Sequence, residues 1–238
     1  MAIVSQYIDY ADDGTALQGR VFYDDAVALP RAAVLVGHQW GGRDEFADGQ
    51  AEALAQLGYV GFALDMYGTG VRGHSIPENS ALMAPFMEDR ARVARRTQAA
   101  LATVKALPQV DPNRVAGIGF CFGGLCLLDL ARSGADLRGV VSFHGLLKPS
   151  GLPAAPISAK ILVLHGADDP LAPIDEFIAL REEFTAAGAD WQAHIYGNAK
   201  HAFAVPGANV PEIGVLHNAN AERRSKASMR AFLEEVLA

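Results

Sequence analysis

A cysteine set among glycines is the residue in this chain best placed to do chemistry. Cys121 lies in residues 119–124 (GFCFGG), the cysteine counterpart of the G-x-S-x-G turn that presents a nucleophile between a strand and a helix. A helix that begins at Phe122 would direct its unpaired N–H groups and the positive end of its dipole at the thiol. Both effects favour the thiolate near neutral pH. We therefore predict that Cys121 is a nucleophile, and that the N–H of Phe122 stabilises an oxyanion.

The other cysteine, Cys126, is predicted to have no chemical role. It falls inside a short segment that is apolar almost all round, from Phe122 to about residue 131. Such a helix is expected to be buried at the centre of the fold. Buried cysteines of this kind are usually packing residues.

A nucleophilic cysteine needs a base, and the base needs an orienting group. Residues 165–173 (HGADDPLAP) and 199–203 (AKHAF) each follow a predicted strand, which gives the chain order nucleophile, acid, histidine. His201 is therefore the predicted base. Asp168 and Asp169 compete for the role of acid, and Asp169 is favoured because Asp168 is better placed to cap the turn with its side chain.

Three further histidines also follow predicted strands. His38, His144 and His165 lack the H-E-x-x-H spacing, or any similar spacing, of a metal site. We expect them to line the pocket or to brace its loops. No metal and no other cofactor is expected.

The elements that must position these residues alternate between strand and helix, a pattern typical of parallel βαβ units. Residues 6–23 form a predicted hairpin that turns at Asp13-Gly14, at the edge of a sheet. Further strands are predicted over 32–37, 59–64, 114–119, 139–143, 160–164 and 191–196, and helices over 44–57, 87–107, 122–131, 173–187 and 220–237, with 65–80 as loop. The prediction is an α/β fold with about eight strands, whose ligand binds at the carboxyl ends of the strands.

Composition excludes several classes of protein. The 238 residues include 20 basic and 27 acidic side chains, for a net charge of −7, and two cysteines. Two cysteines exclude a disulfide scaffold and a four-cysteine zinc site. An acidic chain with no basic run is not expected to bind nucleic acid. We expect no secretory signal, because the first residues show no basic segment followed by a long apolar one. No apolar run reaches the length of a membrane span. We expect one domain over 1–238 in a soluble, cytoplasmic protein, as a monomer or homodimer, with a small-molecule partner.

Over nearly its full length the chain resembles the dienelactone hydrolase family of α/β-hydrolases. The resemblance rests on residues 38–42 (HQWGG), 64–68 (LDMYG), the cysteine turn, and the segments that hold Asp169 and His201. It implies an α/β-hydrolase fold and a Cys121–His201–Asp169 triad that opens an ester or lactone through a thioester. It also implies an oxyanion hole made by the N–H groups of Phe122 and Trp40.

Two departures from the family pattern bear on activation and substrate. Gln39 takes the place of a glutamate that helps to activate the cysteine in well-known members, so activation should fall to His201 alone, because an amide cannot accept the proton. Val205 takes the place of an arginine that grips a substrate carboxylate, which disfavours carboxylated dienelactones. Arg90 could bind a carboxylate instead, although Arg90, Arg92, Arg95 and Arg96 together are more typical of a solvated helix face.

The predicted pocket residues come from the loops around Cys121. They are His38, Gln39, Tyr67, Arg90 and Phe203. Residues 65–88 should cover the pocket, with Tyr67, Met83, Phe86 and Met87 either lining it or packing in the core.

The chemistry of a thiol nucleophile narrows the expected substrate. A thiolate leaves a tetrahedral intermediate more readily than an alkoxide does, so activated esters and lactones are expected to react in preference to alkyl esters. The alternatives are a thioesterase or acyltransferase of the same fold, and a binding module that has lost its chemistry.

Overall fold

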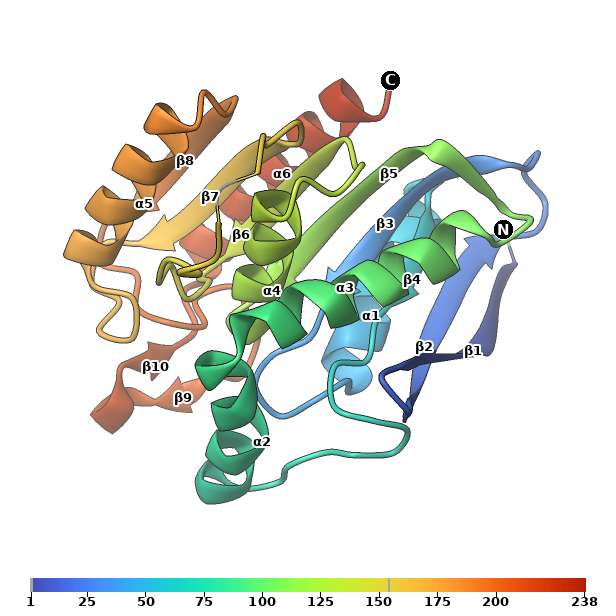
Figure 1. Cartoon of the computed structure of the whole chain (residues 1–238). Coiled ribbons are helices and arrows are strands. Elements are labelled where there is room, and N and C mark those ends of the chain that lie inside the picture. The colour runs from blue at the N-terminus through green and yellow to red at the C-terminus, as the bar shows by residue number, and fades with distance from the viewer. Residues whose placement is uncertain (1, 154) are drawn as a thin grey trace.

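The computed structural model describes residues 2–153 and 155–238 and is built around an eight-stranded sheet (Figure 1). The strand order is β1-β2-β4-β3-β5-β6-β7-β8. The N-terminal hairpin pairs antiparallel and forms one edge, whereas β3 to β8 are parallel to one another. The strands are β1 (Ile3–Asp12), β2 (Thr15–Asp24), β3 (Arg31–Gly37), β4 (Val60–Ala63), β5 (Val110–Phe120), β6 (Gly139–Phe143), β7 (Lys160–Gly166) and β8 (Trp191–Tyr196). The predicted edge hairpin and the mostly parallel sheet are confirmed.

Helices cover both faces of the sheet (Figure 1). They are α1 (Glu45–Gln56), α2 (Ile76–Glu88), α3 (Arg90–Lys105), α4 (Phe122–Arg132), α5 (Ile174–Ala186) and α6 (Ala219–Val236). Apolar residues of α3, α4 and α5 form the core on one face, and those of α1 and α6 form the core on the other. Every residue of α4 is buried, as its apolar composition predicts.

Local signals account for the ends of several helices. The side chain of Asp44 accepts a hydrogen bond from the Ala47 N–H at the start of α1, and Gly58 follows its end with φ of +94°. Both features match the predicted cap and stop. Asn218 caps α6 in the same way through the Ala221 N–H.

The prediction was wrong for the segment between β4 and α3. Residues 76–80, predicted as loop, belong to α2, and the predicted helix 87–107 is two helices that break at Asp89. A signal for α2 was present: Ser75 and Glu78 have the spacing of a capping box, and the Glu78 N–H donates to Ser75 Oγ over 3.4 Å. Asp89 ends α2 and caps α3 by accepting from the Arg92 N–H over 3.0 Å.

A small hairpin after β8 was not predicted. It consists of β9 (Asn209–Val210), the single turn η1 (Pro211–Ile213) and β10 (Val215–Leu216). Strands of two residues carry no periodicity that a sequence pattern could reveal. Below, residues 209–216 are called the β9–β10 hairpin.

The structure also bears on a membrane location. Across residues 2–153 and 155–238, none of the helices combines the length and apolar character needed to span a bilayer.

Candidate active site

Cys121 occupies a sharp turn between β5 and α4. Its backbone adopts φ of +55° and ψ of −117°, a conformation that non-glycine residues rarely adopt. A Cβ on Gly119 would overlap the backbone of Gly123, and a Cβ on Gly123 would overlap the backbone of Gly37. The two glycines of the motif are therefore required for the close approach of α4 to β3 and β5.

Hydrogen bonds hold Cys121 in this strained conformation. Its N–H donates to the Phe143 carbonyl over 3.1 Å, and its carbonyl accepts from the Gly124 N–H over 3.0 Å. The neighbouring strand β6 and the first turn of α4 thus fix the direction of the side chain. The thiol is largely buried but reaches the wall of a cavity.

His201 and Asp169 form a buried pair in the loops that follow β8 and β7. His201 Nδ1 lies 2.8 Å from Asp169 Oδ2, and both residues are at most 3% exposed. The other carboxylate oxygen of Asp169 accepts from the N–H groups of Leu171 and Ala172 over 2.9 and 3.2 Å. Asp169 rather than Asp168 therefore caps this turn, contrary to expectation, and Asp168 is exposed.

The surroundings of His201 favour its protonated form. Burial lowers the pKa of His201, but the negative charge of the Cys121 thiolate and the hydrogen bond with Asp169 outweigh it and raise that pKa to about 10. Its Nε2 is buried and has no partner of hydrogen-bonding geometry among the described residues. Catalytic hydrogen bonds are often long before substrate binds. The surroundings of the pair therefore stabilise the imidazolium form of His201.

Two backbone N–H groups near Cys121 make no hydrogen bond to a described residue. They belong to Phe122, the first residue of α4, and to Trp40, in the loop after β3. Both were the predicted oxyanion donors, and that role stays a prediction.

A cavity of about 680 Å³ opens over Cys121 and His201. Most of its lining is apolar, and Lys148 is the one lysine or arginine among the described residues that line it. The lining also includes Gln39, Trp40, His74, Ser75, Ile76, Asn79, Met83, Met87, Leu146, Leu171, Ala202, Val210, Ile213 and Val215. Gln39, Met83 and Met87 line this cavity, and the two methionines also pack against the core.

Three other predicted pocket residues lie behind the cavity wall. His38 donates from Nδ1 to the Gln39 carbonyl over 2.5 Å and accepts at Nε2 from the Met66 N–H over 3.2 Å, so it braces two loops. The Tyr67 hydroxyl donates to the Trp40 carbonyl over 2.8 Å.

Phe203 is fully buried and packs edge-on against His144. Phe86 likewise belongs to the core.

Arg90 is neither a pocket residue nor part of a solvated face. Its Nε and Nη2 each lie 2.7 Å from the carboxylate of Asp129, which is fully buried in α4. Its remaining donors reach the carbonyls of Lys148 and Pro149 over 3.3 Å. A lone aspartate in the apolar helix α4 was the signal that a buried cation must pair with it.

Arg96 is buried as well. Its Nε lies 3.1 Å from Asp12 Oδ2, and its Nη1 donates to the Met66 carbonyl over 2.9 Å. The predicted solvated face is therefore wrong for two of its four arginines.

His144 and His165 pack around the pair rather than line the cavity. Neither ring makes a hydrogen bond to a described residue, and burial lowers the pKa of both. The His144 ring lies edge-on to His201 at 5.3 Å, and the His165 ring stacks on Phe177. Within the described ranges, no group of three or more His, Cys, Asp or Glu side chains is arranged to hold a metal.

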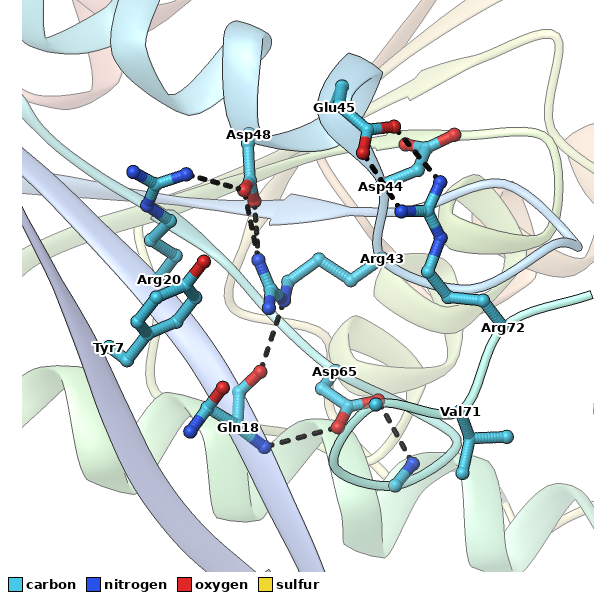
Figure 2. A pocket seen from close by; sticks show the side chains of 12 residues that line it. Tyr7, Gln18, Arg20, Arg43, Asp44, Glu45, Asp48, Asp65, Val71 and Arg72 are labelled. Atoms are coloured by element: carbon cyan, nitrogen blue, oxygen red, sulfur yellow. Dashed lines mark hydrogen bonds and ion pairs between the residues drawn. The ribbon is translucent and has the colours of Figure 1, made fainter.

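A second pocket, of about 170 Å³, is polar and lies next to α1 (Figure 2). Its arginines already have partners: Arg43 and Arg20 both pair with Asp48, at 2.8 and 3.1 Å, and Arg72 pairs with Glu45 at 3.0 Å. Neither Cys121 nor His201 reaches it. The apolar cavity is therefore the candidate active site.

Comparison with known proteins agrees with the fold. The family model named Dienelactone hydrolase family matches residues 17–237. A crystal structure of a dienelactone hydrolase-like promiscuous phosphotriesterase, P91 from metagenomic libraries, superposes with a TM-score of 0.94. It is 38% identical in sequence, and the match covers all of both chains.

Two curated relatives are also similar. An uncharacterized Caenorhabditis elegans protein, K02A2.1, is 40% identical over 60% of this chain and 93% of its own length. A Methylorubrum extorquens protein assigned as a carboxymethylenebutenolidase is 27% identical over 73% of this chain and 64% of its own length.

Proposed function

The chain belongs to the dienelactone hydrolase family of carboxylic-ester and lactone hydrolases, and we propose that it cleaves activated esters or lactones through Cys121, His201 and Asp169. The α/β-hydrolase fold of that family is the fold described above. The observation that carries the proposal is the joint position of Cys121 and His201 on the wall of one cavity, with Asp169 hydrogen-bonded behind the histidine.

The proposed reaction has two steps. The Cys121 thiolate attacks the carbonyl carbon, and the N–H groups of Phe122 and Trp40 stabilise the oxyanion that forms. The C–O bond to the leaving group breaks, and that oxygen takes a proton from His201 Nε2. His201 then removes a proton from water, which attacks the thioester and releases the acid and the thiolate.

The leaving group determines which substrates are hydrolysed and which return unchanged from the tetrahedral intermediate. From the tetrahedral intermediate, a thiolate departs more readily than an alkoxide, so an alkyl ester reverts to substrate. A phenolate or an enolate departs readily. We therefore expect aryl esters, enol lactones and thioesters to be hydrolysed far faster than ethyl acetate.

Substitution of the nucleophile tests the proposal. Cys121→Ala should lower kcat/KM for an aryl ester by about 10³-fold or more, because the acyl-enzyme can no longer form. Cys126→Ala is the matched control, since Cys126 lies in α4, the helix that follows Cys121, and outside the cavity lining. Mass spectrometry of the wild-type chain, quenched early in turnover, should show one added acyl group. Full activity of Cys121→Ala would overturn the proposal.

The other functions proposed from the sequence give different products. An acyltransferase would pass the acyl group to an added alcohol or thiol, and a thioesterase would prefer acyl-thioesters to aryl esters. A binding module would show no turnover, and its Cys121 would react with iodoacetamide at pH 6–7 no faster than an ordinary thiol.

The similarity to P91 favours a second activity at the same cavity. That protein is described as a promiscuous phosphotriesterase, and the two chains match over their full lengths. The thiolate of Cys121 could attack phosphorus and displace a phenolate, with water then releasing the phosphoryl group. We expect slow hydrolysis of an aryl dialkyl phosphate by the wild-type chain and none by Cys121→Ala.

A further inference from the structure

Two walls of the apolar cavity come from different elements. One wall is a single face of α2, since residues three and four apart lie on the same side of a helix. It consists of Ile76, Asn79, Met83 and Met87. The other wall is the β9–β10 hairpin, through Val210, Ile213 and Val215. Figure 1 places α2 and the hairpin beyond the same end of the sheet.

The hairpin is attached to the backbone of His201. The His201 N–H donates to the Gly214 carbonyl over 3.1 Å, and the His201 carbonyl accepts from the Leu216 N–H over 2.9 Å. Val215, between these two residues, forms an isolated bridge with His201. The hairpin wall therefore lies on the same side of Cys121 as His201.

The α2 wall is attached to the loop that carries Trp40. The Gly73 N–H, just before α2, donates to the Gly41 carbonyl over 2.9 Å. A Cβ on Gly41 would come within 3.3 Å of Asn79 Oδ1. The Tyr67 hydroxyl, which donates to the Trp40 carbonyl, belongs to a ring that packs against Phe86 of α2 at 5.4 Å. The α2 wall therefore lies on the side of Trp40, one of the two proposed oxyanion donors.

The geometry of the reaction assigns a part of the substrate to each wall. In the tetrahedral intermediate the carbonyl carbon bears the Cys121 sulfur, the oxyanion, the leaving-group oxygen and the acyl group. The oxyanion must reach the N–H groups of Phe122 and Trp40, and the leaving-group oxygen must reach His201 Nε2. The leaving group therefore extends on the side of His201, and the acyl group extends away from it.

We infer that the β9–β10 hairpin is the leaving-group subsite, and that the α2 face is an acyl subsite for neutral, medium-length apolar chains. The inference rests on the proposed function, because it takes the positions of the oxyanion and the leaving group from that mechanism. Neither wall carries a charged side chain, and apart from Asn79 both are apolar, which selects uncharged groups. The flexible side chains of Met83 and Met87 suit an unbranched chain.

A matrix of four esters tests this assignment. Acetyl and octanoyl esters of 4-nitrophenol and of 4-methylumbelliferone combine a short or long acyl group with a one-ring or two-ring leaving group. The ratio of kcat/KM for octanoyl over acetyl measures the acyl preference. The ratio for the two-ring over the one-ring phenol measures the leaving-group preference.

Variants of each wall should change one preference and leave the other. Met83→Ala should lower the octanoyl preference about tenfold with either phenol, because the chain loses its apolar contacts. Ile213→Ala should change the leaving-group preference by a similar factor and leave the acyl preference as it is. Ser80→Ala and Glu212→Ala are matched controls, since both are exposed neighbours outside the cavity lining. Both preferences should stay unchanged in them.

The possible outcomes test the assignment of the two subsites separately from the proposed mechanism. If Met83→Ala changes the leaving-group preference and Ile213→Ala changes the acyl preference, the assignment is reversed and the inference fails. Equal effects of both variants on both preferences also overturn it. Val210→Ala replaces Ile213→Ala if that variant does not fold. The mechanism is judged separately, by the acyl-enzyme mass and by Cys121→Ala.

Discussion

At the scale of residues, the two groups proposed to react are each held by a part of the chain distant in sequence. Cys121 is fixed by the Phe143 carbonyl of β6, and His201 is fixed on its side chain by Asp169 and on its backbone by the β9–β10 hairpin. Such contacts restrain both groups before substrate arrives, which is how positioned groups gain rate.

The neighbouring aspartates Asp168 and Asp169 provide a test with a built-in control. Asp169→Asn should lower kcat/KM by about 10⁴-fold, because the amide stabilises the wrong tautomer of His201 and no longer supports the imidazolium. Asp168→Asn should leave kcat/KM within about twofold, since Asp168 is exposed and the carboxylate paired with His201 is that of Asp169. Steady-state kinetics on an aryl ester measures both, and equal losses would contradict the assignment of Asp169.

Replacement of Cys121 should change the pKa of His201. The pKa of His201 is raised to about 10, and the Cys121 thiolate is the largest of the causes that raise it. In Cys121→Ala that cause is gone and burial remains, so the pKa must fall. His201 will then lose its proton at a lower pH than in the wild type. Nitrogen-15 NMR of the imidazole ring measures the change, and an unchanged pKa would mean that the two side chains do not interact.

At the scale of elements, buried ion pairs join the helices that surround the site. Arg90 at the start of α3 pairs with Asp129 of α4, and Arg132 of α4 pairs with both Asp129 and Glu183 of α5. The same Arg90 holds the carbonyls of residues 148 and 149, at the rim of the cavity. The helix α4, which follows Cys121, is thus held to its neighbours by ion pairs as well as by apolar packing.

Removal of Arg90 should destabilise the chain strongly. Arg90→Met leaves the fully buried carboxylate of Asp129 with Arg132 as its remaining cation, and we expect a loss of about 3 kcal/mol in the free energy of unfolding. Arg181→Met is the control, because Arg181 forms an exposed pair with Glu182 and should cost less than about 1 kcal/mol. Urea denaturation measures both losses, and similar values for the two variants would refute the role given to Arg90.

At the scale of the whole molecule, the overall charge and the cavity favour uncharged substrates. The net charge is −7, and Lys148 is the one lysine or arginine among the described residues of the cavity lining. Val205 and the buried Arg90 provide no cation there. An anionic ester therefore meets long-range repulsion and little local compensation.

Salt dependence should reveal this difference between substrates. For a neutral aryl ester, kcat/KM should change by less than about twofold between 10 mM and 500 mM salt. For an aryl ester that carries a terminal carboxylate, kcat/KM should start lower and rise with salt, as the repulsion is screened. A fall with salt for the anionic ester would point instead to attraction by Lys148.

The sequence alone predicted most of the structural features that depend on a few neighbouring residues. The glycines around Cys121, the caps of α1 and the period of the strands are each patterns of a few neighbouring residues, and Cys121, Asp169 and His201 were each picked out because they follow a predicted strand. The start of α2 also had a local capping signal, at Ser75 and Glu78, and Asp89 is a capping residue type at the break between α2 and α3; the prediction used neither signal.

The tertiary structure decided which side chains meet. Arg90 and Asp129 are 39 positions apart, yet their ion pair holds α4 in place. The β9–β10 hairpin has no local sequence pattern, yet it holds the backbone of His201. Whether Tyr67, Phe203 and Arg90 face the cavity or the core depends on how α2, α3 and α4 pack together. Turn and helix preferences act over a few residues, whereas burial and ion pairing depend on contacts that exist only once the chain has folded.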